Sequence, residues 1–226
     1  MKMELRIAKR QEPSLLWRSA LVITGAVVAA LTLSMLLLAL RGISPFEGLG
    51  VLVMGAFGTS WALQDCLLKA IPLFLCSLGV AIAFRLQIWN IGAEGQFALG
   101  AIGATWIALS FGNQPKLLLL PLMILTACTA GGLWGMIPAL FRQWLGANEI
   151  IVTLMLNYIG ILLLDYLVYG VWRDSSGFPM TAAFSENAIV GKIGASSVHW
   201  GLAHCVALGM LCWLFFRYTR TGYEIK

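Results

Sequence analysis

The chain alternates long apolar runs with short polar segments, and six of the runs approach or exceed the length of a membrane span. A helix needs about 20 mainly apolar residues to cross the hydrocarbon core of a bilayer. The pattern therefore predicts an all-α fold, a polytopic bundle of transmembrane helices with about six spans. The predicted spans are approximately 19–40, 67–84, 95–111, 117–141, 150–170 and 198–216.

The first part of the chain contains one long apolar run, 19–40, and one interrupted segment, 43–65. The run 19–40 is too long for the apolar region of a signal peptide, and no small-residue cleavage site follows it, so we predict a retained helix. Residues 43–65 are interrupted by a proline and two acids, which favours an interfacial or re-entrant element on the far side of the membrane. Pro72 is expected in the first turn of the next span, where proline is tolerated.

Composition narrows the class of protein. Hydrophobic residues make up 60% of the 226 residues and charged residues only 11%, whereas a soluble domain carries roughly 25% charged residues. These values exclude a soluble enzyme, a disordered chain and a disulfide scaffold. The lipid bilayer is the expected surrounding, and the net charge of +5 sits at the ends of apolar runs, so nucleic acid is not an expected partner.

The positive charges predict an orientation. With the N-terminus inside the cell, the inner segments hold ten lysines and arginines and the outer segments hold five. Because cytoplasmic loops carry the excess of positive charge, we expect a cytoplasmic N-terminus. Three spans that would run inward end in Phe-Arg, at 84–85, 141–142 and 216–217. The expected organisation is a basic cytoplasmic tail, 1–18, followed by a transmembrane domain, 19–226.

The sequence offers no sign of catalysis. The five cysteines form no CxxC pair, and the two histidines lack metal-ligand spacing. Nucleotide-binding and hydrolase motifs are also missing from the sequence. We therefore predict no enzyme activity, no cofactor and no metal site.

The densest polar cluster is the segment NIGAEGQ, residues 90–96, between two apolar runs. Its glycines let the backbone approach a solute, while Asn90, Glu94 and Gln96 offer hydrogen-bond donors and acceptors. An ionisable group this close to a membrane helix often marks a pathway. Glu94 could equally be an acid in the first turn of a helix, where the helix dipole favours a negative charge.

A second polar cluster begins at residue 146. Asn148 is a plausible N-cap, and Glu149 falls in the first turn of the helix that follows. Glu149, Thr153 and Asn157 are spaced four residues apart, so they form one polar stripe on that helix. Such a stripe could line a pathway, or it could hold helices together through interhelical hydrogen bonds.

Together these two clusters carry a family resemblance. The segment from Pro72 through Phe84-Arg85 to NIGAEGQ, with GANEIIVTLMLNYI at 146–159, resembles the inner-membrane permeases of bacterial ABC importers. Within that group, which includes ribose-type and branched-chain amino-acid permeases, the chain is most similar to the nucleoside or simple-sugar permease subfamily. The resemblance extends from about Pro45 to Tyr223.

The resemblance implies which partners the chain has and which of its residues form the pathway or gate. It implies half of a membrane dimer in the bacterial inner membrane, paired with a cytoplasmic ABC ATPase and supplied by an extracytoplasmic solute-binding lipoprotein. The two glutamates become N-terminal or gate residues, and the amides become hydrogen-bond partners for a neutral, hydroxyl-rich solute. The implied pathway or gate residues are Asn90, Glu94, Gln96, Asn148, Glu149, Thr153 and Asn157.

Family members continue well beyond a Thr-Gly pair like Thr221-Gly222, into a coupling helix and further spans. The resemblance therefore implies that the transmembrane domain is truncated at its C-terminus. Two other functions stay open at this point. Glu94 and Glu149 could couple proton movement in a secondary transporter, or the chain could be a membrane scaffold that transports nothing.

Overall fold

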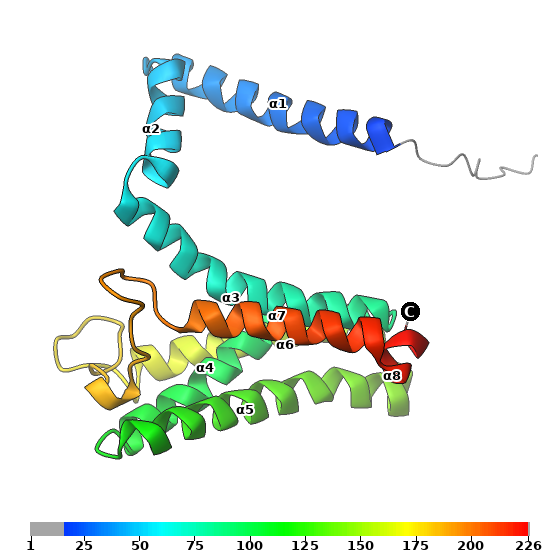
Figure 1. Cartoon of the computed structure of the whole chain (residues 1–226), viewed down its shortest axis with the longest axis vertical. Helices are drawn as coiled ribbons and strands as arrows, with labels where there is room; N and C mark the ends of the chain where they lie inside the picture. The colour runs from blue at the N-terminus through cyan, green and yellow to red at the C-terminus, as the bar shows by residue number, and fades with distance from the viewer. Residues whose placement is uncertain (1–15, 226) are drawn as a thin grey trace, which may run out of the picture. The chain divides into compact units, whose positions relative to one another are not determined.

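The computed structural model describes residues 16–225, and every regular element in that range is helical. The predicted basic tail, 1–18, therefore falls for its first 15 residues outside the described part of the chain. In chain order the elements are α1 (Leu16–Leu40), α2 (Pro45–Phe57), α3 (Ser60–Arg85), α4 (Ala93–Ser110), α5 (Lys116–Leu145), α6 (Glu149–Tyr169), the 3-10 turn η1 (Glu186–Ala188), α7 (Gly201–Tyr218) and α8 (Arg220–Glu224) (Figure 1).

The all-α prediction is confirmed, and five described helices, one fewer than the six predicted spans, are by themselves long and apolar enough to cross a membrane. These helices are α1, α3, α5, α6 and α7. The predicted span 95–111 does form a helix, α4, yet it is not apolar enough to join them because it carries Glu94, Gln96 and several glycines. Since α4 packs against both α5 and α6, much of its surface meets other helices, where small and polar residues are tolerated.

The segment 43–65, predicted to be an interfacial or re-entrant element, contains the short apolar helix α2 and the first turns of α3. Ser44 caps α2 by accepting a hydrogen bond from the Glu47 backbone N–H at 3.5 Å. α3 starts at Ser60, so Pro72 lies inside the helix and its predicted first-turn position is wrong. Asp65, which suggested a later start, forms an ion pair of 2.7 Å with Lys69, one turn further along the helix.

The chain divides into two units, 1–63 and 64–226. In the first unit α1 and α2 meet at a corner through a turn at Gly42, whose φ of 76° favours glycine (Figure 1). The two helices touch where Gly48 faces the side chain of Leu38. The large apolar side chains that the structure describes on α1 are almost all exposed, as suits a helix that faces lipid.

The second unit contains a triplet of helices and a pair of helices. α4 packs against α5 and α6, which also contact each other. α3 and α7 lie side by side, with the buried Cys205 thiol 3.7 Å from the Ile71 carbonyl oxygen and the Phe74 ring against Gly209 (Figure 1). At the end of this pair the Arg85 guanidinium lies 4.5 Å from the centre of the Phe216 ring.

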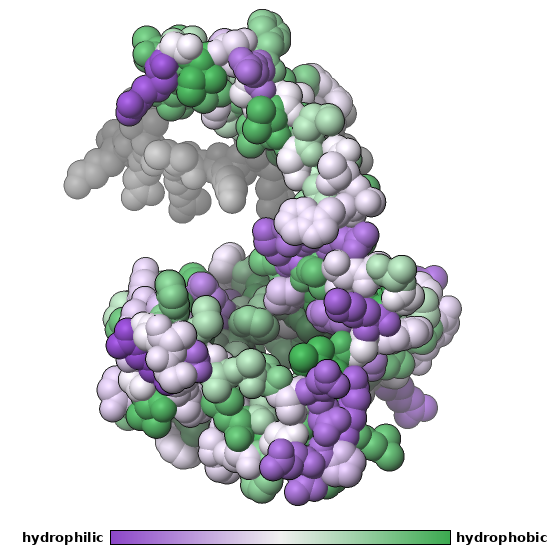
Figure 2. All heavy atoms as spheres, turned by 90° about the vertical axis from the view of Figure 1, so that its left-hand side faces the viewer, coloured by the Kyte–Doolittle hydropathy of each residue, from purple (hydrophilic) through white to green (hydrophobic). Residues whose placement is uncertain are grey.

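The two ends of this unit differ. α3, α5 and α7 all end at the same end of the unit, where the three Phe-Arg pairs lie, and the irregular segment 171–200 lies at the opposite end (Figure 1). At that opposite end hydrophilic and apolar side chains are mixed over the surface (Figure 2). There Ala188 of η1 packs onto Ile107, Ala108 and Leu119, and the Ser185 hydroxyl donates to the Gly112 carbonyl oxygen at 2.7 Å.

Candidate functional site

The start of α4 lies against the side of α6 rather than beside its first residue. The Thr153 hydroxyl, one turn into α6, accepts a hydrogen bond from the Ile91 backbone N–H at 3.3 Å. One turn further on, the Asn157 side-chain oxygen accepts a short hydrogen bond from the Gly95 backbone N–H. The polar stripe predicted on α6 therefore faces the segment 90–96.

These contacts have a clear physical role. The first backbone N–H groups of a helix have no partner within the helix, and inside a membrane each unsatisfied group is costly. Gly92, the N-cap of α4, has no side chain that could accept a hydrogen bond. Asn157, which is 8% exposed, provides such an acceptor for the Gly95 N–H from the neighbouring helix. Thr153, which is 3% exposed, accepts from the Ile91 N–H just before the helix begins. This is the helix-holding alternative for the stripe, and its contacts are confirmed.

Glycine makes the close approach possible. A Cβ on Gly95 would lie 2.7 Å from the Asn157 Cα, and a Cβ on Gly92 would lie 2.9 Å from the Thr153 carbonyl oxygen. On the other side of α4, a Cβ on Gly131 of α5 would lie 2.9 Å from the Gln96 carbonyl oxygen. The helices therefore meet backbone to backbone, and this fixes the segment 90–96 between α5 and α6.

A polar cavity of about 550 Å³ opens beside this segment. It lies where the end of α3 and the linker to α4 meet α5 and the start of α6. Amides, a hydroxyl and an ion pair share its wall with aliphatic side chains. The lining residues are Ala83, Leu86, Ile88, Asn90, Gln96, Gly135, Pro138, Ala139, Arg142, Gln143, Glu149 and Thr153.

The cavity brings together four of the seven predicted site residues: Asn90, Gln96, Glu149 and Thr153. The other three have supporting positions. Asn148 caps α6 by accepting from the Ile150 N–H at 2.9 Å, as predicted. Glu94 falls in the first turn of α4, also as predicted, and accepts a hydrogen bond of 3.4 Å from the Asn157 amide.

An ion pair of 3.0 Å joins Arg142, near the end of α5, to Glu149, at the start of α6. In the sequence Arg142 stands out only as the second residue of a Phe-Arg pair, and its contact with Glu149 was not predicted. The sequence did contain a signal for this contact, namely a glycine at position 146 that could end the helix. In the structure Gly146 ends α5 in the left-handed conformation, so the chain turns back within a few residues. The charges of this pair offset each other at the wall of the cavity.

Gly135, Pro138 and Gln143 were also missed. Gly135 and Pro138 sit in an apolar helix, and nothing in the sequence distinguishes the face of α5 that meets α4 from the other faces. In the described part of the chain, no cluster of histidine, cysteine or acidic side chains is arranged to hold a metal ion.

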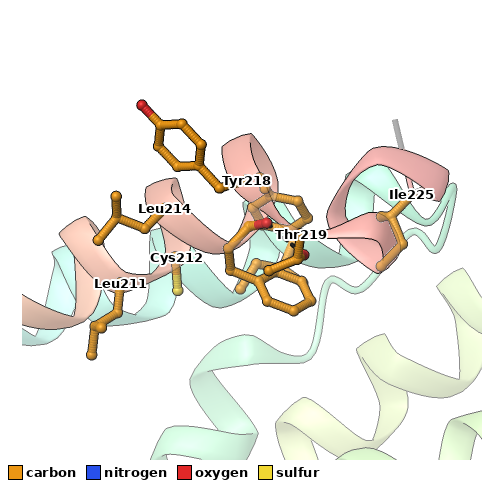
Figure 3. A pocket seen from close by; sticks show the side chains of 9 residues that line it. Leu211, Cys212, Leu214, Tyr218, Thr219 and Ile225 are labelled. Atoms are coloured by element: carbon orange, nitrogen blue, oxygen red, sulfur yellow. Dashed lines mark hydrogen bonds between the residues drawn. The ribbon is translucent and has the colours of Figure 1, made fainter.

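A second cavity, of about 650 Å³, lies between α3, α7 and α8 (Figure 3). Its wall is made of side chains such as Leu211, Leu214 and Ile225, and the Tyr218 ring is directed away from the middle of the group. The Thr219 hydroxyl donates to the Phe215 carbonyl oxygen of its own helix. This cavity offers little to a hydroxyl-rich solute, so the polar cavity is the candidate site.

Comparison with known proteins decides the family. Residues 62–226 match the model of the family described as branched-chain amino acid transport system / permease component. The chain belongs to this permease family. The resemblance seen in the sequence is thereby confirmed, and the chain is a multi-pass membrane protein.

Curated relatives match most or all of the length of this permease. It is 34% identical to the glucose ABC transporter permease protein TsgB13 of Haloferax volcanii, over 100% of this chain and 62% of that protein. It is 30% identical to the guanosine ABC transporter permease protein NupP of Bacillus subtilis, over 89% and 59%, and 29% identical to the nucleoside ABC transporter permease protein NupB of Lactococcus lactis, over 92% and 60%. The permease chain thus spans about three fifths of the length of these relatives. No solved structure matches it.

Proposed function

We propose that this permease forms the membrane pathway of a bacterial ABC importer for nucleosides or simple sugars. The observation that carries the proposal is the polar cavity at one end of α3 to α6, in a unit whose helices are otherwise apolar. Membership of the permease family and the names of the relatives support the same function. They do not support the alternative of a proton-coupled secondary transporter.

The site residues divide into three groups in this proposal. Asn90, Gln96 and Thr153 contact the solute during passage, because their side chains line the cavity. Arg142 and Glu149 form a gate across α5 and α6, because a single ion pair joins the two helix ends beside the cavity. Glu94, Asn148 and Asn157 keep the start of α4 and the start of α6 in place.

The orientation and the partners belong to the same proposal. The end that carries Arg85, Arg142 and Arg217 faces the cytoplasm, which leaves the N-terminus inside the cell. A cytoplasmic ATPase binds at this end and drives transport. A second permease subunit completes the pathway, and a solute-binding lipoprotein delivers the solute to the opposite end, where the segment 171–200 lies.

Uptake of radiolabelled guanosine and glucose by right-side-out vesicles loaded with ATP tests the proposal. The permease is assembled with its ATPase and its binding lipoprotein, and a matched control carries an ATPase that cannot hydrolyse ATP. We expect uptake of at least one solute that requires hydrolysis and persists when the proton gradient is dissipated. Uptake that stops with an uncoupler while ATP is maintained would instead favour the secondary transporter.

A further inference from the structure

We infer that Gly135 of α5 positions the Gln96 amide in the polar cavity, and that this amide selects neutral solutes with a hydrogen-bond donor and acceptor side by side. The inference rests on the proposed function, because it assigns solute selection to the same cavity. It concerns Gly135 as a positioning residue and Gln96 as the group that contacts solute.

Two glycines one turn apart on α5, Gly131 and Gly135, lie against Gln96. A Cβ on Gly131 would lie 2.9 Å from the Gln96 backbone oxygen, so the backbone of α4 sits directly against that glycine. A Cβ on Gly135 would lie 2.9 Å from Nε2, 3.1 Å from Cδ and 3.5 Å from Oε1 of the Gln96 side chain. Gly131 therefore determines how the backbone of Gln96 lies against α5, and Gly135 determines where the Gln96 side-chain amide lies.

The Gln96 amide is available to a solute. Most other polar groups of the cavity already have partners: Asn90 accepts from the Gly92 N–H at 2.9 Å, Thr153 accepts from the Ile91 N–H, and Arg142 pairs with Glu149. Among the described residues, no hydrogen bond involves the side chain of Gln96, which is half-buried in the cavity wall.

The chemistry of an amide indicates the ligand. A glutamine side chain offers two N–H donors and a carbonyl acceptor in one plane. A solute matches it when a donor and an acceptor lie next to each other, as they do on the edge of a nucleobase or on two neighbouring sugar hydroxyls. Both sources share this chemistry, and transport of the two kinds of solute distinguishes them.

A methyl group at Gly135 changes this amide without displacing a helix. The nearest atoms belong to the end of a flexible side chain, which can rotate away, so Gly135→Ala should still assemble. Gly132→Ala is the matched control, because a Cβ at that neighbouring position meets nothing within 4 Å. The effect of a methyl group at 135 should also depend on Gln96 being present.

The test measures maximal uptake rates of labelled guanosine and of labelled glucose by the assembled transporter, normalised to permease in the membrane. We expect Gln96→Ala and Gly135→Ala each to lower the rate of the carried solute about three- to tenfold, the value of one neutral hydrogen bond. Gly132→Ala should leave it unchanged. Gln96→Asn, which shortens the side chain, should restore part of the rate in the Gly135→Ala protein, and Gly135→Ala should have no further effect on Gln96→Ala.

Several results would overturn the inference and leave the proposed function intact. One is a normal rate for Gln96→Ala in a transporter whose wild-type uptake requires ATP. Another is equal rates for Gly135→Ala and Gly132→Ala. If Gly135→Ala fails to assemble, Gln96→Asn in the otherwise unchanged permease tests the inference. The shorter side chain moves the amide away from the solute, so the uptake rate must fall if the inference is right. Absence of ATP-dependent uptake in the wild type would overturn the proposed function itself.

Discussion

The triplet α4–α6 and the corner formed by α1 and α2 are both rich in glycine, but the glycines have different surroundings. In the triplet, a Cβ on Gly95 or Gly103 would come within 2.7 Å of a backbone atom on a neighbouring helix. In α1 and α2, a Cβ on Gly25 or Gly55 would meet nothing within 4 Å, and the close contact at Gly48 is with a side chain. Close backbone contact brings polar side chains of one helix within reach of another, and the polar cavity lies beside the triplet.

The largest effect of this difference is expected for Gly95→Ala in α4. Its methyl group would lie 2.7 Å from the Asn157 Cα, a backbone atom that can move only if α6 moves. We expect a loss of about 2–3 kcal/mol of stability, as for an overpacked core, and a lowered Tm in detergent. Gly25→Ala is the control and should leave the Tm unchanged, and equal effects of the two changes would contradict the comparison.

Asn157→Leu should have the next largest effect. The change keeps the side chain's approximate size and removes the acceptor of the Gly95 N–H and the donor to Glu94. An unpaired buried N–H costs about 1–2 kcal/mol, so the thermal unfolding temperature should fall. Hydrogen exchange should quicken at the first turn of α4 and stay slow in the middle of α5. Unchanged protection at Gly95 would show that the amide of Asn157 is not its cap.

Two neighbouring glycines of α5, Gly131 and Gly132, test the same difference within a single helix. Gly131→Ala should cost about 1 kcal/mol, because its methyl group meets the Gln96 backbone oxygen at 2.9 Å. Gly132→Ala should be neutral or stabilising by up to about 0.5 kcal/mol, because alanine favours the helix and the position is open. Detergent unfolding curves of the two proteins give the difference directly. If the two are equally stable, the assigned face of α5 is wrong.

The smallest effect on stability is expected at the Arg142–Glu149 ion pair. The Arg142 side chain is 49% exposed, so solvent screens the pair and its contribution should stay below about 1 kcal/mol. Arg142→Gln should therefore hardly change the Tm but should change uptake if the pair is a gate. Exchanging the two charges, Arg142→Glu with Glu149→Arg, should recover uptake more than either single change does. A gate role would be wrong if all three variants transport normally.

Much of the fold follows from the sequence because it depends on local signals. The apolar runs predicted α1, α5, α6 and α7, and the cap at Asn148 and the position of Glu94 were found as expected. The start of α3 was misplaced because Asp65 looks like an interruption when read singly, whereas in the helix it pairs with Lys69 one turn further on. α8 was missed, although Thr219 caps it by accepting from the Gly222 N–H.

The site was predicted less completely, because cavities depend on which helix faces which. Asn90, Gln96, Glu149 and Thr153 could be found as polar groups in an apolar chain. Gly135 could not, since glycines at 131, 132 and 135 look alike until α4 is placed against one face of α5. The contact between Arg142 and Glu149 depends on the turn at Gly146, which reverses the chain.

The cap that α6 provides for α4 has a consequence for the order of biosynthesis. Gly95 and its acceptor Asn157 are 62 residues apart, so α4 leaves the ribosome well before its cap exists. At 5–20 residues per second the delay is about 3–12 seconds. During that time the start of α4, with Glu94 and unpaired N–H groups, is poorly suited to lipid, so α4 must wait at the insertion machinery or at the bilayer surface. The position of one asparagine in α6 thus determines when an earlier helix can finish entering the membrane.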